Sequence, residues 1–477
     1  MRIISVFLFI LFFFYSSILC AQNKSNAQIV AFVECGGGMH IGEHMPMWQV
    51  SNTHGLSSLD NNSYLRSAFS YSDSIAACRV NTKLDLVIGV GFTSLLTVHQ
   101  AYVDLSYKWI ELMIGSKEFN SPLLNQELSS GGLTWSGNSR PIPQVRVGIL
   151  DYMQILPKLA FRAELSYGWF TDNNFQRARV GEQYSYTRDI KYHHKAVFLR
   201  IGIPNGKWIL DLGMSLDTQF GGVKVGGVDA GDLGNGFVDY LHALIPMPGN
   251  KKKPLGEQVA FQGNFLGSEH IRLTYRHEKC DLSVYMENFY DDFSGMGKFN
   301  GWDGLWGIEY KKKNNQLISG LVLEYFQSTN QSGPMHGLDN SEVKKTGGAD
   351  DYYNNDWYPG WVHWGMSIGT PLILSPIYNK NGDLSFNYNR VRALHLGWSG
   401  EVGEVWRYVA KLSFSRTWGT PFKPSSYILE NFSTFASLYY SPKRWRGNWL
   451  FNVSLACDIG DVYGDNIGFN FKIRRTF

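Results

Sequence analysis

Two stretches of the sequence combine aromatic, amide and charged side chains in a way that suits binding rather than catalysis. The first covers residues 115–148 and contains Trp135, Asn138 and Arg140. A tryptophan offers a flat apolar face that can stack on the C–H face of a sugar ring, and amide and guanidinium groups hold polar partners in fixed directions. These three residues are therefore candidate contacts for a carbohydrate.

The second stretch, residues 330–364, is dense in Tyr, Trp, Asn and Asp, with Gly and Pro between them. The same reasoning gives a second set of candidate contacts, which are Gln331, Asp351, Tyr353, Asn354, Trp357 and Trp361. Each aromatic residue in this set could instead belong to an interfacial girdle beside an ordinary polar loop.

Signatures of catalysis are missing from the sequence. It has no P-loop, no dinucleotide-binding fingerprint, no G-x-S-x-G and no H-E-x-x-H. Ser136 and Ser139 could serve a hydrolase at the lipid boundary, but no histidine lies near them in the sequence. His40 and His44 have the spacing of metal ligands on a helix, yet the glycines around them argue against a helix. We therefore expect no enzyme, no metal and no cofactor.

The elements that must carry these stretches repeat with a period of two residues. Apolar or aromatic residues alternate with charged or small ones at residues 161–169, 210–216, 271–276 and 407–415. Runs of roughly ten such residues predict tilted transmembrane strands. A charged fraction of only 18% and an aromatic fraction of 15% fit the same structure. We predict an all-β fold, a transmembrane antiparallel up-and-down barrel of about 18 strands. The strand count stays open between roughly 16 and 20, because the number of strands within residues 327–392 is ambiguous.

Connections between the predicted strands alternate between short and long. The short ones lie at residues 205–206, 276–279, 313–315, 400–404 and 441–446, and the long ones at 116–143, 171–193, 217–266, 327–360 and 417–431. Outer-membrane barrels have short periplasmic turns and long extracellular loops. The long connections, which hold both candidate stretches, are therefore expected on the cell surface.

The N-terminal residues have the pattern of an export signal. Arg2 precedes an apolar run at residues 3–19, which predicts a signal peptide over residues 1–21. Residues 22–60 are expected to form a periplasmic segment, a plug or a first strand. Residues 61–477 are expected to form the barrel, located in the cell outer membrane and in contact with its lipid.

The C-terminal residues form an amphipathic pattern at 467–477 that ends in Phe477. This resembles the signal that the barrel assembly machinery recognises, although an ordinary edge strand ending in Phe would look the same. Among the remaining cysteines, Cys35 and Cys78 could form a disulfide. The net charge of +3 gives no reason to expect nucleic acid as a partner.

Three motifs resemble a known family. They read SGGLTWSGNSRPIPQV, GWDGLWGIEY with EYFQSTNQSGP, and DDYYNNDWYPGWVHWGMSIGTP. They are similar to the Wzi family of capsule-assembly outer-membrane proteins, in the form found in Bacteroidetes, and the resemblance runs from about residue 60 to the C-terminus. It implies a barrel whose outer loops help to attach exported capsular polysaccharide to the cell surface, as a lectin-like anchor. Proteobacterial members carry a small periplasmic helical element with no counterpart here, which leaves open whether the lumen is plugged.

A porin or solute channel is the alternative function. A barrel of roughly 16 to 18 strands is wide enough for an aqueous lumen. The alternation places Arg162, Glu164, Arg272, Arg276 and Arg407 on the inner face, where they could line a pore or pair with one another to plug it.

Overall fold

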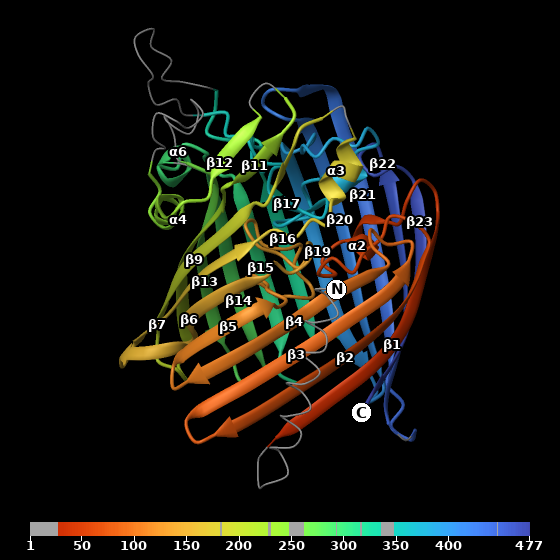
Figure 1. Ribbon diagram of the computed structural model, residues 1–477. Helices are drawn as coiled ribbons and strands as arrows, with labels where there is room; N and C mark the ends of the chain where they lie inside the picture. Colours follow the sequence, from red (N-terminus) through yellow and green to blue (C-terminus); the bar gives the residue numbers. More distant parts are fainter. Residues whose placement is uncertain are drawn as a thin grey trace, which may run out of the picture.

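Antiparallel strands pair in sequence order around a closed cylinder in the computed structural model of the chain (Figure 1). The structure describes residues 27–181, 184–227, 230–247, 262–291, 293–314, 317–334, 348–445 and 447–477, so the expected signal peptide lies outside it. The wall is an 18-stranded sheet. Its strands are β1 Gln28–Ile41, β2 Asn62–Ile75, β3 Cys78–Val90, β4 Leu96–Tyr107, β5 Ile110–Ser116, β6 Gln144–Leu156, β7 Leu159–Trp169, β9 Lys191–Ile201, β10 Trp208–Phe220, β13 Asn264–Arg276, β14 Cys280–Tyr290, β15 Gly304–Lys312, β16 Gly320–Gln327, β19 Val391–Val402, β20 Trp406–Gly419, β21 Pro424–Tyr440, β22 Asn448–Gly460 and β23 Asn466–Thr476. The predicted fold is confirmed.

The first and last strands of the wall close the cylinder. β1 pairs with β2 on one side and with β23 on the other, in a register that runs from Phe32 opposite Thr476 to Ile41 opposite Ile467. Each wall strand therefore has a partner at both edges, which leaves no row of backbone groups exposed to lipid. Residues 28–41, left open by the sequence as plug or strand, belong to the wall.

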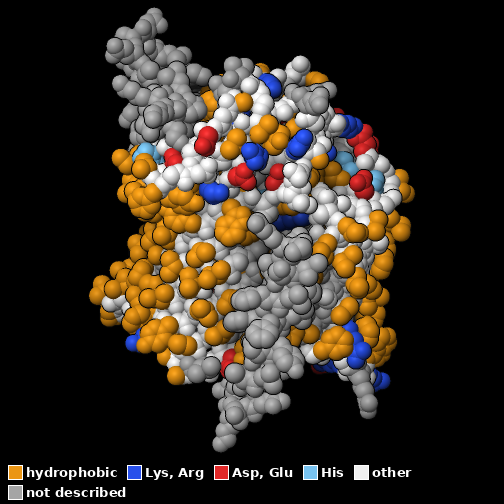
Figure 2. Space-filling model, in the orientation of Figure 1, with side chains coloured by type: hydrophobic (Ala, Val, Ile, Leu, Met, Phe, Trp, Pro, Cys, Tyr) orange, Lys and Arg blue, Asp and Glu red, His pale blue; other side chains and the backbone are white. Residues whose placement is uncertain are grey.

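Side chains alternate between the inside and the outside of the cylinder. On β10, Asp211, Ser215 and Asp217 are buried on the inner face, and Leu210 and Leu212 lie on the outer one. Figure 2 shows hydrophobic side chains covering the wall, with charged side chains gathered mostly beyond its upper part. Because a closed barrel with an apolar outer face satisfies all of its backbone groups in lipid, it spans a membrane, and barrels of this type belong to outer membranes. The protein is an outer-membrane β-barrel.

The two ends of the cylinder differ in the length of their connections. The turns between β2 and β3 and between β9 and β10 lie at the same end as the start of β1 and the end of β23, which we assign to the periplasm. The long connections at the opposite, extracellular end join β1 to β2, β5 to β6, β7 to β9, β10 to β13, β14 to β15 and β16 to β19. The predicted long loop at 417–431 is wrong, because β20 continues to Gly419 and β21 begins at Pro424, which leaves only a tight turn.

Short elements form part of the extracellular connections. They are α2 Met47–Val50, α3 Phe175–Val180, α4 Phe237–Leu244, α6 Phe293–Met296, the 3-10 helix η1 Pro376–Tyr378, and the small strands β8 Tyr186–Arg188, β11 Gly222–Val225, β12 Gly231–Gly234, β17 Val362–His363 and β18 Met366–Ser367. Among the described residues, no helix is both long and apolar enough to cross a membrane. The ambiguous region 327–392 adds no strand to the wall between β16 and β19.

The described cysteines are free thiols. Cys35 lies on β1 and Cys78 at the start of β3, with β2 between the two strands. The disulfide considered from the sequence therefore does not form.

Candidate functional site

The connection between β5 and β6, residues 117–143, crosses the lumen instead of extending from the cell surface. The Leu128 carbonyl lies 2.8 Å from Nε2 of His395, whose N–H can donate to it. His395 is on β19, which faces β5 across the barrel, because equal numbers of strands separate the two in either direction around the sheet. Gly397 on the same strand makes room for the crossing, since a Cβ there would lie 2.3 Å from the Leu128 oxygen.

Carboxylates on the inner wall hold this crossing segment in place. Glu324 accepts hydrogen bonds from the Ser129 hydroxyl at 2.6 Å and from the Ser130 amide at 2.7 Å. Glu287 accepts from the Leu133 amide at 2.8 Å. Because buried charges are stable only when hydrogen-bonded or paired, these carboxylates require the donors that the segment supplies.

The connection between β16 and β19 packs onto the crossing segment from the extracellular side. The Trp361 indole donates to the Thr134 carbonyl at 2.8 Å, and Tyr353 donates its hydroxyl proton to the Leu133 carbonyl. Gly369 permits this approach, because a Cβ at that position would lie 2.0 Å from both the Leu133 oxygen and the Tyr353 hydroxyl. The two candidate stretches named from the sequence are therefore packed against each other inside the barrel.

The connection between β1 and β2 enters the lumen as well. The Met47 amide at the start of α2 donates to Asp458 Oδ2 at 2.8 Å, and the Trp48 indole donates to the Ser413 hydroxyl at 3.1 Å. Trp48 joins a buried cluster with Trp135, Trp361, Tyr352, Tyr353, Phe289 and Phe386. Aromatic packing of this kind makes the extracellular half of the lumen a protein core.

Several of the predicted carbohydrate contacts belong to this core, which is a correction to the sequence analysis. Trp135, Asn138, Gln331, Tyr353 and Trp361 are buried. Their polar atoms bind protein: the Trp135 indole donates to Asp217 at 2.7 Å, and Asn138 Nδ2 donates to the Ser367 hydroxyl at 2.9 Å. These residues hold the lumen segments together and do not lie on the cell surface.

The serines considered for catalysis lie in the same core. Ser136 donates its hydroxyl proton to the Gly369 carbonyl at 2.7 Å, and the Ser139 hydroxyl faces the Arg140 carbonyl at 3.5 Å. Within the described residues, no group of three or more His, Cys, Asp and Glu side chains is arranged to hold a metal ion.

Other predicted residues line an open groove on the extracellular face. The groove has a volume of about 440 Å³ and is lined by carboxylate, amide, aromatic and cationic side chains, among them Asp350, Asp351, Asn354, Asn387, Phe422 and Lys423. Partial burial raises the pKa of Asp351, whose Oδ1 accepts hydrogen bonds from Asn389 at 2.6 Å and Asn354 at 3.2 Å. Phe422 is 57% exposed, so its ring is available as an apolar face.

The sequence analysis missed Asn387, Phe422 and Lys423. Phe422 and Lys423 lie in the tight turn between β20 and β21, inside a region predicted to be a long loop. Asn387 belongs to the run SFNYN at residues 385–389, which lies within the stretch 327–392 whose secondary structure was ambiguous from the sequence. The run Pro421-Phe422-Lys423-Pro424, in which two prolines flank the Phe and the Lys, was the one local signal of a turn in this part of the groove.

The predicted residues Arg140 and Trp357 each take part in a contact between a cation and an aromatic ring near the extracellular end. Arg140 contacts Trp364, and Trp357 contacts Lys224. The Arg140 guanidinium lies 4.1 Å from the centre of the Trp364 ring, and Lys224 lies 4.7 Å from that of Trp357. Arg140 also donates to the Thr93 hydroxyl at 2.6 Å. Burial lowers the pKa of Arg140 to about 10, and among the described residues no carboxylate forms an ion pair with it.

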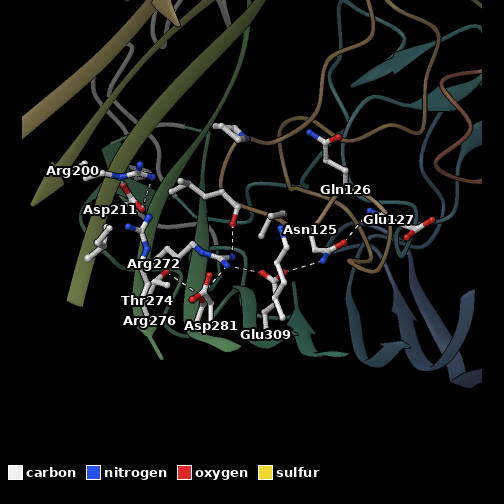
Figure 3. Close-up of a pocket in the computed structure, with 16 residues that line it drawn as sticks. Asn125, Gln126, Glu127, Arg200, Asp211, Arg272, Thr274, Arg276, Asp281 and Glu309 are labelled. Carbon is white, nitrogen blue, oxygen red and sulfur yellow. Dashed lines mark hydrogen bonds and ion pairs between the residues drawn. The ribbon is translucent and has the colours of Figure 1, made fainter. Parts of the chain in front are cut away.

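The periplasmic half of the lumen contains a cavity of about 500 Å³, drawn in Figure 3. The underside of the crossing segment, residues 122–127, forms its roof, and inward-facing charged side chains form its walls. Arg272 pairs with Glu309 at 2.6 Å, and Arg200 pairs with Asp211 at 2.7 Å. Three of the inner arginines predicted from the alternation pair with carboxylates, since Arg162 contacts Glu164, Arg272 contacts Glu309 and Arg407 contacts Glu127. The fourth, Arg276, instead donates to the Pro204 carbonyl at 2.6 Å.

Comparisons with known proteins concern the fold. A scan against protein-family models and a search of curated proteins found no match. Among solved structures, the chain is similar to OccK5 (OpdH) of Pseudomonas aeruginosa, at 8% identity and a TM-score of 0.48, over 94% of this chain and 98% of that one. It is similar to OccD3 (OpdP) of the same organism at 9% identity and a TM-score of 0.49, over 95% of this chain and 91% of that one. A loop-deletion mutant of OmpT of Vibrio cholerae matches at 7% identity and a TM-score of 0.41, over 95% and 99%. Such values say nothing of what this chain binds.

Proposed function

We propose that this barrel retains an exported polysaccharide, such as a capsule, at the outer surface of the cell. The observation that carries the proposal is the groove of Asp351, Asn354, Asn387 and Phe422, which opens on the extracellular face above a lumen occupied by folded segments. Amide and carboxylate groups can bind sugar hydroxyls, and an exposed ring can stack on a sugar. The resemblance to capsule-assembly proteins in the motifs quoted above supports the same function.

A groove of this size contacts only a few sugars, so a single binding event is expected to be weak. Retention of a polymer does not require tight single-site binding, because one chain can engage many copies of the barrel. Arg140, with its uncompensated charge, adds a contact for an acidic group of the polymer. The barrel is then an anchor and not an enzyme.

The test is deletion of the gene, followed by staining of cell-bound and released polysaccharide. We expect the polymer to move from the cell surface into the medium while total synthesis is unchanged. Complementation with Phe422→Ala should fail to restore retention, whereas complementation with Phe299→Ala, an exposed ring outside the groove lining, should restore it. Unchanged retention in the deletion strain would contradict the proposal.

A solute channel is the second candidate, and the charged periplasmic cavity in Figure 3 favours it. Arg272, Arg276 and Asp281 present alternating charge to any solute that enters from the periplasm. A channel would require the crossing segment to move aside. Large, stable current steps from the wild-type barrel in planar bilayers would support this candidate, and their absence would favour the anchor.

A further inference from the structure

The outward-facing side chains of β9 change from apolar to polar along the strand, from its periplasmic end to its extracellular end. Val197 and Leu199 point outward and are exposed, as expected for a strand in lipid. The next outward positions toward the cell surface are Lys195 and His193, because Tyr192 and His194 both contact Asp217 inside the barrel. His193 is 0% exposed although it faces away from the lumen, so another part of the chain covers it.

The covering element is α4, which packs on β9 and β10. Lys195 donates from Nζ to the Ala243 carbonyl at 3.0 Å and to the Leu244 carbonyl at 2.5 Å, at the C-terminal end of this helix. Tyr167, an outward residue of β7, donates its hydroxyl proton to the Tyr240 carbonyl at 2.9 Å. The Tyr240 ring lies 5.0 Å from that of Phe220 at the end of β10. Figure 1 accordingly shows α4 on the flank of the barrel, outside the wall.

The depth of this contact follows from strand geometry. Lys195 lies six residues from Ile201, the outward residue at the periplasmic end of β9. A rise of about 3.3 Å per residue and a tilt of about 40° place Lys195 roughly 15 Å above Ile201, within an apolar band about 25 Å tall. An ammonium group at that depth requires polar partners, and the carbonyl groups of α4 supply them.

The side of α4 that faces away from the barrel is apolar. Phe237, Val238 and Leu241 are exposed, with Phe237 at 77% and Val238 at 56%, and so is Ile245 directly after the helix. The polar residues of the helix point elsewhere: His242 Nδ1 lies 2.8 Å from Gln262 Oε1, and Asp239 accepts from the Gly236 amide at 2.7 Å. The helix thus covers a polar part of the wall and presents hydrocarbon in its place.

We propose that α4 is a lipid-contacting helix, and that its residues Phe237, Val238 and Leu241, together with Ile245 directly after it, lie among the acyl chains of the outer leaflet. Continuity with the lipid-facing wall distinguishes lipid from a protein partner as the occupant. Figure 2 shows hydrophobic side chains continuing from the flank where α4 lies onto the strands below it, without a polar rim between them. A protein-docking patch would be expected to be bordered by polar residues.

The inference is independent of the polysaccharide proposal and is tested by photo-crosslinking in intact cells. A photoreactive amino acid replaces Leu241 in the full chain, and the barrel is purified after irradiation and weighed by mass spectrometry. The matched control position is Lys380, an exposed residue of the connection between β16 and β19 that does not line the groove. Only barrels that keep their folded mobility on unboiled gels are scored, which removes misfolded variants.

We expect a mass increase equal to lipid A or a phospholipid at position 241 and none at position 380. Val238, on the same side of the helix, serves as a second position in case the first variant does not fold, and the same lipid adduct is expected there. An adduct with another polypeptide, including a second copy of this chain, would overturn the proposal. So would the absence of a lipid adduct at both helix positions.

Discussion

The indole Nε1 of Trp135 donates a hydrogen bond of 2.7 Å to Oδ1 of Asp217 inside the barrel, joining the crossing segment to the wall strand β10. The same carboxylate accepts from Tyr192 and lies 2.8 Å from His194 Nδ1. One buried carboxylate thus joins three partners, Trp135 from the crossing segment and Tyr192 and His194 from the neighbouring strand β9.

Asp217→Ala should destabilise the barrel by about 3–5 kcal/mol, because it leaves buried donors and the His194 ring without their acceptor. Urea unfolding in lipid vesicles, followed by tryptophan fluorescence, measures the difference. Asp232→Ala, at an exposed position of the small strand β12, should change stability by no more than about 0.5 kcal/mol. A loss for Asp217→Ala as small as that of the control would show that this contact is not structural.

Glu324→Ala should raise the ionic conductance of the barrel. The substitution removes the acceptor for Ser129, Ser130 and Tyr285, so the crossing segment loses its attachment to β16. We expect low conductance from the wild type in planar bilayers and larger, fluctuating currents from the variant. Glu404→Ala, which breaks only an exposed pair with Lys443, is the control. Equal conductance in all three proteins would mean that the segment does not close the lumen.

Phe422→Ala and Asn387→Ala should each weaken binding of purified polysaccharide, and Asn387→Ala also removes the hydrogen bond of 3.0 Å that its Nδ2 donates to Asn379 Oδ1. Both side chains line the groove. Loss of one stacking or hydrogen-bonding contact, at about 1 kcal/mol, corresponds to roughly a fivefold weaker affinity at each site. Surface plasmon resonance on immobilised barrels measures the affinity. Wild-type affinity in the double variant would show that the groove does not bind the polysaccharide.

Arg140→Ala should weaken binding of acidic polysaccharides more than that of neutral ones. The guanidinium has no carboxylate partner among the described residues, so its charge is available to an anionic group. Added salt should reduce the affinity of the wild type for acidic polymers and have less effect on the variant. Arg140→Lys, which keeps the charge, should retain part of this salt dependence. Equal losses for neutral and acidic polymers would assign Arg140 to packing alone.

Acidification should loosen the packing around His363 in the connection between β16 and β19. Burial lowers the pKa of this imidazole to about 4, and its Nδ1 lies 2.9 Å from the Arg140 carbonyl. The pKa of a histidine in the unfolded chain is about 6.5, so the unfolded state binds a proton at a higher pH than the folded state does. The stability contributed by neutral His363 is therefore complete above about pH 6.5 and is lost as the pH falls toward 4. Hydrogen exchange of residues 361–370, corrected for intrinsic rates, should therefore accelerate between pH 7.5 and pH 5. His363→Gln should lack this acceleration.

The barrel itself was predictable because period-two alternation directly encodes a wall with lipid on one side. The placement of the aromatic loops was not, since Trp, Tyr, Asn and Asp suit both a sugar-binding surface and a packed polar lumen. Trp135 and Phe422 illustrate the difference: the first lies within a conspicuous motif and is buried, whereas the second lies in a turn and is exposed. The inner carboxylates Glu287 and Glu324 were the one signal of an inward loop, because buried charges demand donors that the wall does not supply.

The seam between β1 and β23 sets an order of events for biogenesis. The pairing of Ile41 with Ile467 cannot form until the whole wall has been made, and the cylinder remains an open sheet until then. While the sheet is open, residues 42–61, 117–143 and 349–390 can reach its concave side through the gap between β1 and β23. Once the seam has formed, the extracellular end is the route that remains to them, because a closed wall offers no lateral entry. Closure of the seam therefore divides the filling of the lumen into an early lateral stage and a later stage from the cell-surface end.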